Sequence, residues 1–219
     1  MAKALAPARP AFWANARRQL SAADPVLAAI IYCHPRIALA GRGDAFWTLA
    51  RAIVGQQISV KAADSVWARV QAACIELSPR SVLRRDPTIL RGCGLSQRKV
   101  EYLQDLAGHF VDRRVDEASL AQMADEDVIA TLTDIRGIGR WTAEMFLIFN
   151  LMRPDVLPLD DLGLLKAVGR HYLDEEAPAS LSRGEGRQQV VELASRWIPY
   201  RSVATWYLWR SMEPVPVEY

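Results

Sequence analysis

Two closely spaced glycines near the middle of the chain constrain its fold more than any other feature. Gly137 and Gly139 lie between two runs that are compatible with helix, residues 125–135 and 142–152. Glycine permits positive φ and close backbone approach, so a tight hairpin between two helices is expected. The first N–H groups of the second helix have no intrahelical partner and lie at the positive end of its dipole. The pattern predicts a phosphate-binding hairpin, although a glycine turn used only for helix packing has the same pattern.

A pair of carboxylates follows this hairpin. Asp160 and Asp161 open a further apolar run that is compatible with a helix. Capping of a helix N-terminus is the commonest function of Asp at such a position, and one of the two fits that interpretation. Two adjacent acids exceed what a cap needs. An anionic carboxylate also stabilises the oxocarbenium-like transition state in which a glycosidic bond breaks, so catalysis is the alternative.

Short helices that begin at capping residues account for most of the chain. The expected helix starts are Asp24, Asp44, Ser59, Ser78, Asp86, Ser96 and Asp125. Apolar residues recur at helical spacing within these segments. No strand alternation and no fixed-period repeat is found, so we predict an all-α chain of roughly ten helices. Two helical lobes with a cleft between them are compatible with this pattern.

Composition excludes some classes of protein and leaves others open. Hydrophobic residues make up 51% of the 219 residues, which is enough for a sizeable core. The net charge is only +2, so a nucleic-acid site would have to depend on local basic patches and main-chain amides. Cys33, Cys74 and Cys93 lack metal-binding spacing and are expected to be reduced core thiols. No apolar run is long enough for a membrane span and no signal peptide is recognised, so a cytoplasmic protein is expected.

The aromatic residues have two possible uses. Trp13, Trp47 and Trp67 lie on apolar helical faces, where core packing is the better interpretation. Trp141 follows the hairpin directly and Trp209 lies in an aromatic-rich segment near the C-terminus. A nucleotide flipped out of a duplex is stacked between aromatic faces, so we favour these two for a base pocket.

An amide pair interrupts one of the apolar helical runs. Gln56 and Gln57 must find hydrogen-bond partners or water. The pair fits either a polar turn between helices or a loop that probes a duplex and fills the gap left by a flipped nucleotide.

Charged and main-chain groups could complete a DNA contact. Basic residues that could follow phosphates are Lys61, Arg98, Lys99, Arg136, Arg140, Lys166, Arg170 and Arg201. Most surface cations are simply solvated. Arg136 and Arg140 are the favoured candidates for phosphate binding, because they lie at the hairpin. The main-chain carbonyls of Thr133, Ile135 and Ile138 could face a monovalent cation beside the phosphate.

Taken together, these motifs resemble the helix-hairpin-helix DNA glycosylases, whose family name also records a Gly/Pro-rich loop and an Asp. The resemblance is to the 3-methyladenine DNA glycosylase II (AlkA-type) branch and covers roughly residues 25–212. The segments that carry it are LARAIVGQQIS, GLSQRKVEYLQDLA, IRGIGRWTAEMFL, LPLDDLGLLKA and WIPYRSVATWYLW.

The resemblance implies a two-lobed all-α fold with a DNA-binding cleft between the lobes, and Asp161 as the catalytic carboxylate. It places Trp141 and Trp209 in the base pocket, Gln56 near it, and Gln57 at the position of an intercalating wedge. The implied DNA-binding residues are Gln57, Gly137, Gly139, Arg136, Arg140 and Thr142. The implied cation ligands, for Na⁺ or K⁺, are the carbonyls of Thr133, Ile135 and Ile138.

Some residues depart from the family pattern. Met145, one turn after Trp141, stands where a pocket aromatic is expected. We include Met145 in the predicted base pocket, whose shape then departs from the family pattern. Trp141 occupies the position where bifunctional relatives, which cleave the strand through a Schiff base, place a Lys. The four cysteines of the iron–sulfur branch are missing from the C-terminal region, and we expect no room for the extra N-terminal α/β domain of larger members.

We therefore expect a monofunctional hydrolase that releases alkylated bases such as 3-methyladenine and 7-methylguanine from double-stranded DNA. No cofactor and no iron–sulfur cluster are expected, and the protein is expected to be a monomer in the bacterial cytoplasm, associated with the nucleoid. The alternatives are a related glycosylase for deaminated or oxidised bases, or a non-catalytic helix-hairpin-helix DNA-binding module.

The expected domain organisation is a flexible tail over residues 1–9 and a single glycosylase domain over 10–219. Within that domain a central lobe spans about residues 45–150. The N-terminal helices and about residues 160–212 form the second lobe.

Overall fold

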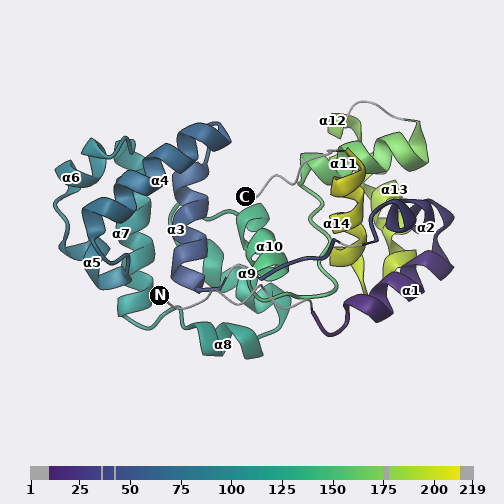
Figure 1. Cartoon of the computed structure of the whole chain (residues 1–219), viewed down its shortest axis with the longest axis horizontal. Helices are drawn as coiled ribbons and strands as arrows, with labels where there is room; N and C mark the ends of the chain where they lie inside the picture. The colour runs from purple at the N-terminus through teal and green to yellow at the C-terminus, as the bar shows by residue number, and fades with distance from the viewer. Residues whose placement is uncertain (1–9, 36, 42, 175–177, 213–219) are drawn as a thin grey trace. The chain divides into compact units, whose positions relative to one another are not determined.

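The computed structural model describes residues 10–35, 37–41, 43–174 and 178–212, and the predicted tail over residues 1–9 lies outside them. No strand occurs in the described ranges, which confirms the all-α prediction (Figure 1). The chain divides into two compact units. We call residues 42–146 the hairpin unit, and residues 1–41 with 147–218 the carboxylate unit.

The hairpin unit is built from short capped helices. They are α3 (Ala45–Gly55), α4 (Val60–Cys74), α5 (Pro79–Arg84), α6 (Pro87–Gly92), α7 (Gln97–Val111), α8 (Glu117–Gln122), α9 (Asp125–Thr133) and the first part of α10 (Arg140–Phe149). The caps predicted at Asp44, Ser59, Ser78, Asp86 and Ser96 are confirmed, because each side chain accepts a main-chain N–H of the first turn.

Helix α3 forms the centre of the hairpin unit and packs against α4 and α7 (Figure 1). Its inward residues Leu49, Ala50 and Ile53 have no solvent exposure. Aromatic pairs strengthen both contacts: Phe46 meets Phe110 of α7 edge to face, and the rings of Trp47 in α3 and Trp67 in α4 do the same at 5.2 Å. Core packing of Trp67 is thereby confirmed.

The carboxylate unit joins the first two helices to the last part of the chain. It contains α1 (Trp13–Ala23), α2 (Pro25–Cys33), α11 (Leu162–Val168), the π-helical segment η1 (Gly169–Leu173), α12 (Pro178–Leu181), α13 (Gly184–Ala194), the 3₁₀ segment η2 (Ser195–Trp197) and α14 (Arg201–Met212). Helix α14 is buried along most of its length and packs against α1, α2 and α11. No helix in the described ranges of either unit is long and apolar enough to cross a membrane.

A fully buried aspartate ties the carboxylate unit together. Asp24 caps α2 as predicted, because its Oδ1 accepts the N–H groups of Val26 and Leu27 at 2.9 and 3.1 Å. Its Oδ2 accepts the Tyr172 hydroxyl at 2.9 Å and the Trp197 indole N–H at 2.8 Å. Burial, reinforced by Asp24, raises the pKa of Tyr172 and keeps its hydroxyl a donor. Four donors therefore satisfy this carboxylate inside the core.

Several helix boundaries differ from prediction. The short helices α8 and α12 were missed, because four to six residues carry too little periodicity to stand out. The expected helix over residues 186–198 is interrupted at Ser195, where η2 begins. The helix start predicted at Asp125 is confirmed, because Asp125 is the first residue of α9, and its N-cap residue Ala124 makes no side-chain bond.

The buried carboxylate leads to a stability prediction. Asp24→Ala leaves the Tyr172 hydroxyl and the Trp197 N–H buried without their acceptor, so the free energy of unfolding should fall by about 3 kcal/mol or more. Asp44→Ala removes an exposed cap bond to the Trp47 N–H and should cost about 1 kcal/mol. Urea unfolding of both variants measures the difference, and equal losses would contradict the central role given to Asp24.

Candidate functional site

The turn between α9 and α10 is closed by its own main chain. The Ile135 N–H donates to the Leu132 carbonyl at 3.2 Å, and the Ile138 N–H donates to the Ile135 carbonyl at 3.1 Å. Gly137 adopts φ +85°, and a Cβ built on it would lie 2.2 Å from Cδ2 of Tyr102. Both the backbone conformation and the Tyr102 ring therefore require glycine at this position.

Gly139 has a different role from Gly137. A Cβ at this exposed residue would meet no atom of the described residues within 4 Å, and its φ is not positive. It directly precedes α10, whose first N–H groups have no intrahelical acceptor. Packing therefore explains Gly137 but not Gly139, where a Cβ would enter open space.

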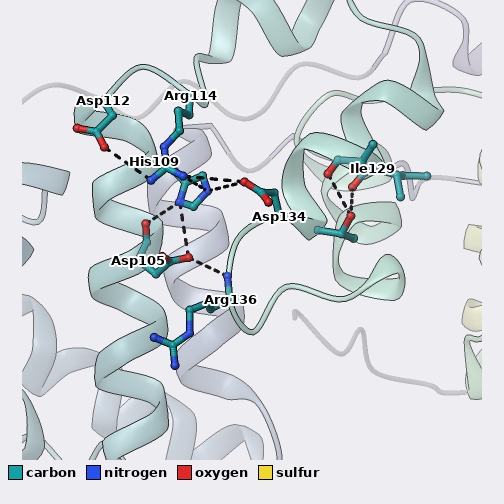
Figure 2. A network of polar contacts seen from close by, with 9 residues as sticks. Asp105, His109, Asp112, Arg114, Ile129, Asp134 and Arg136 are labelled. Atoms are coloured by element: carbon teal, nitrogen blue, oxygen red, sulfur yellow. Dashed lines mark hydrogen bonds and ion pairs between the residues drawn. The ribbon is translucent and has the colours of Figure 1, made fainter.

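Helix α7 contacts the first part of the hairpin, next to the end of α9 (Figure 2). The Asp105 carboxylate accepts the main-chain N–H of Arg136 at 2.8 Å. One turn later, the buried His109 lies with Nδ1 2.9 Å from the Asp105 carbonyl and Nε2 3.2 Å from the Asp134 carboxylate. Arg114 adds a contact to Nε2 of His109 at 2.9 Å. The hairpin is thus held to a rigid helix at Asp134 and Arg136.

The two hairpin arginines are engaged with carboxylates. Arg136 Nη2 lies 3.0 Å from Glu101. Arg140 binds Glu126 through both terminal nitrogens, and its Nε donates to Glu144 at 3.0 Å. The hydrogen bond from Arg140 lowers the pKa of Glu126. Either arginine would have to exchange a carboxylate for a phosphate to bind DNA directly, so their predicted role stays a prediction.

The glutamine loop contacts the hairpin. Gln56 is half-buried at the C-terminus of α3, and its Nε2 donates to the Gly137 carbonyl at 2.8 Å. Gln57 is exposed and has φ +59°, an uncommon value for a side-chain-bearing residue. The structure gives the Gln56 amide a partner within the protein, so its predicted place near a base pocket stays a prediction.

In the carboxylate unit, Asp161 is buried and caps α11. Its Oδ1 accepts the Leu164 N–H at 2.6 Å and the Trp209 indole N–H at 2.8 Å. The neighbouring Asp160 is exposed and pairs with Arg187 at 2.8 Å. The cap is therefore formed by the residue predicted to be catalytic, and Asp160 belongs to a surface ion pair.

Trp209 and Gly163 lie close to the Asp161 carboxylate. The Trp209 ring stacks on Phe149 with centroids 5.8 Å apart and planes 13° apart. A Cβ on Gly163 would lie 3.1 Å from both Asp161 Oδ1 and Trp209 Cδ1. Such close approach leaves little room for the carboxylate or the indole to reorient. Trp209 is thus placed to orient the carboxylate, a contact that was not anticipated for this residue.

The remaining predicted residues lie in and around α10. Trp141 is half-buried in its first turn, and Thr142 and Met145 are buried. The Thr133 hydroxyl donates to the Ile129 carbonyl at 2.8 Å, so that side chain is engaged within α9. The proposed pocket role of Trp141 and Met145, the DNA role of Thr142 and the carbonyl cation site at Thr133, Ile135 and Ile138 stay predictions.

Comparison with known proteins identifies the family of this chain. The family described as "HhH-GPD superfamily base excision DNA repair protein" matches residues 50–191. The chain belongs to the HhH-GPD superfamily.

Individual relatives of this HhH-GPD chain can be named. It is 34% identical over 167 residues to DNA-3-methyladenine glycosylase 1 of Schizosaccharomyces pombe, covering 74% of this chain and 70% of that protein. The crystal structure of a DNA-3-methyladenine glycosidase from Bacillus halodurans superposes with a TM-score of 0.78 at 32% identity, covering 90% and 88%. A 3-methyladenine DNA glycosylase of the same yeast, bound to abasic DNA, superposes with a TM-score of 0.72 at 28% identity, covering 90% and 96%.

Sequence reasoning missed the contacts that hold the HhH-GPD hairpin. Glu101, Asp105 and His109 recur every four residues along α7, opposite its apolar face. Polar residues at helical spacing opposite an apolar face were therefore a readable signal for a second packed element. The partner element, the hairpin 25 to 35 residues later, has no matching local signal.

The two hairpin glycines make different predictions for stability. Gly137→Ala should lower the free energy of unfolding by more than about 2 kcal/mol, because the new Cβ is forced into Tyr102 at a positive φ. Gly139→Ala should change it by less than about 0.5 kcal/mol, because the new Cβ enters open space. Thermal and urea unfolding test the pair, and a large loss in Gly139→Ala would assign that glycine a packing role.

Proposed function

We propose that this protein is a DNA glycosylase that flips a damaged nucleotide out of double-stranded DNA and hydrolyses its N-glycosidic bond, with alkylated bases as substrates and Asp161 as the catalytic residue. The observation that carries this proposal is the buried Asp161 carboxylate, oriented by the N–H groups of Leu164 and Trp209. Membership of a base excision repair family supports the reaction class.

Asp161 suits the chemistry of this bond. Cleavage passes through an oxocarbenium-like sugar, and a fixed carboxylate stabilises the developing positive charge without having to reorganise. Both hydrogen bonds are made to Oδ1, so the orientation of the group is set before substrate arrives. The same carboxylate can direct a water molecule to the sugar, which completes hydrolysis.

Alkylated purines fit as substrates for chemical reasons. Alkylation at N3 or N7 makes a purine cationic and therefore a better leaving group. An electron-rich aromatic surface attracts a cationic ring, as expected of Trp141. Relatives of this chain carry the name DNA-3-methyladenine glycosylase, which supports the same substrate class.

The hairpin is the proposed grip on DNA. The amides around Gly137 and Gly139 would bind a phosphate, and a Na⁺ or K⁺ ion held by the carbonyls of Thr133, Ile135 and Ile138 would add positive charge beside it. Gln57, exposed on its loop, would fill the gap left by the flipped nucleotide. No further cofactor is required for this hydrolysis.

We also propose that the enzyme does not cleave the DNA strand. Strand cleavage by related bifunctional enzymes uses a Lys that forms a Schiff base with the sugar. Trp141 stands at the corresponding position in this chain, and the hairpin from Ile135 to Thr142 contains no Lys. Hydrolysis supported by Asp161 alone would release the base and leave an abasic site.

The catalytic assignment is tested with duplexes that carry 3-methyladenine, 7-methylguanine, hypoxanthine or ethenoadenine. Asp161→Asn should keep DNA affinity but lower the rate of base release at least about 100-fold, because the amide carries no negative charge. Asp160→Asn is the matched control, since it loses only an exposed ion pair and should release base at the wild-type rate.

Single-turnover base release and DNA affinity are measured for all three proteins. Undiminished release by Asp161→Asn would refute the assignment. Tight DNA binding by the wild type with no release from any duplex would instead favour the non-catalytic DNA-binding alternative. Release confined to hypoxanthine would move the substrate class to deaminated bases.

Trp209 is predicted to act through Asp161. Trp209→Phe keeps a ring that can stack on Phe149 but removes the N–H that orients the carboxylate, so kcat should fall about 10-fold or more on every substrate with KM unchanged. Trp206→Phe on the same helix is the control, because the Trp206 indole N–H meets no acceptor among the described residues. A change in KM that depends on the lesion would show that Trp209 serves mainly as a wall of the base pocket.

A further inference from the structure

Lys99 has an unusual position for a lysine. It lies in the first turn of α7 and is half-buried. Its Nζ donates to the Val54 carbonyl at 2.8 Å and to the Gln56 carbonyl at 2.7 Å. Burial lowers the pKa of this ammonium group. From its sequence position Lys99 was a candidate for DNA phosphate, whereas the structure directs its charge at the protein's own main chain.

The energetics of the two helix ends show that the contact with α3, and not the place in α7, explains the position of the Lys99 ammonium group. A cation in the first turn of a helix is unfavourable for that helix, so α7 gains nothing from Lys99. The C-terminus of α3, by contrast, has carbonyls without intrahelical donors and a negative dipole end. Lys99 therefore stabilises the end of α3 and the start of the loop that carries Gln57, at some cost to its own helix.

The same loop is tied to the hairpin from its other side. The Gln56 carbonyl accepts from Lys99, while the Gln56 side chain donates to the Gly137 carbonyl at 2.8 Å. One residue thus links α7, the end of α3 and the hairpin. Because Gln57 follows immediately with φ +59°, its backbone conformation depends on how Gln56 is held.

We propose that Lys99 and Gln56 are positioning residues that fix the Gln57 loop to the hairpin, so that the group entering the duplex and the group gripping phosphate act as one rigid body. This inference rests on the proposed DNA glycosylase function. Base flipping requires Gln57 to occupy the gap in the stacked duplex, and the duplex pushes back on the loop. Attachment of the loop to the phosphate-binding hairpin would resist that force.

Lys99→Met tests this role against direct phosphate contact. If Lys99 binds phosphate, the slope of log affinity against log salt should fall by about 0.9. If it positions the loop, the slope stays unchanged. Single-turnover release of 7-methylguanine paired with cytosine should then drop about 10-fold or more, since two charge-assisted hydrogen bonds are lost. Release of the same base from an unpaired bulge should change far less, because that base needs no wedge.

Arg91→Met is the charge-matched control, since Arg91 is an exposed cation of α6 outside the predicted DNA-binding set. It should leave the ratio of paired to bulged release at the wild-type value. A reduced salt slope in Lys99→Met, or equal loss of release from the paired and bulged substrates, would overturn the proposal.

Gln56→Met provides a second test if Lys99→Met folds poorly. It removes the bond to the Gly137 carbonyl while keeping the main-chain acceptor of Lys99, and should show the same selective loss on the paired substrate.

Where both single variants fold, the double variant should lose less activity than the product of the two single losses, because both residues act on one loop. Fully multiplicative losses would overturn the proposal. If the wild type releases no base at all, the proposed function fails, whereas the salt slope of Lys99→Met on abasic-site DNA still decides whether Lys99 contacts phosphate.

Discussion

Unpaired main-chain groups at helix ends impose the constraint on which this structure depends. A chain of many short helices has many such ends, and each buried one needs a partner. Asp24 satisfies the start of α2 inside the carboxylate unit, and Lys99 satisfies the end of α3 inside the hairpin unit. At the hairpin, the Asp105 carboxylate accepts the Arg136 N–H, and the Gln56 side chain donates to the Gly137 carbonyl. In the proposed function, the amides at the start of α10 would bind a phosphate.

The same constraint joins fold and proposed chemistry at Asp161. Capping and catalysis first stood as alternatives for the carboxylate pair, but the cap itself gives Asp161 the fixed orientation that catalysis needs. Trp209 adds a second donor, and Gly163 leaves room for both groups at a distance that no larger residue permits without displacement. Asp160 does not form this cap and instead pairs with Arg187 at the surface. In the proposed mechanism, the side chain that caps α11 would also supply the negative charge that glycosidic cleavage requires.

The predictable part of the fold is the local part. Helical periodicity and caps such as Asp24 and Ser59 act within four residues, so the all-α class and most helix starts followed from the sequence. Contacts such as Gln56 with Gly137, 81 residues apart, or Trp209 with Asp161, 48 residues apart, have no local signature. Residue type alone also does not show what a side chain contacts. Lys99 is a candidate for phosphate binding by its charge, but its Nζ donates to the main-chain carbonyls of Val54 and Gln56. The family motifs predicted a set of site residues but not the atoms that those residues contact.

Hydrolytic base release without a covalent enzyme–DNA intermediate is the central proposal for this protein. One single-turnover reaction on a duplex containing a single 7-methylguanine tests it most directly, with parallel samples quenched in the presence and absence of borohydride. We predict stoichiometric free 7-methylguanine, a DNA strand that breaks only after alkali, and no protein–DNA adduct. A borohydride-trapped adduct, strand cleavage without alkali, or bound DNA with no released base would contradict it.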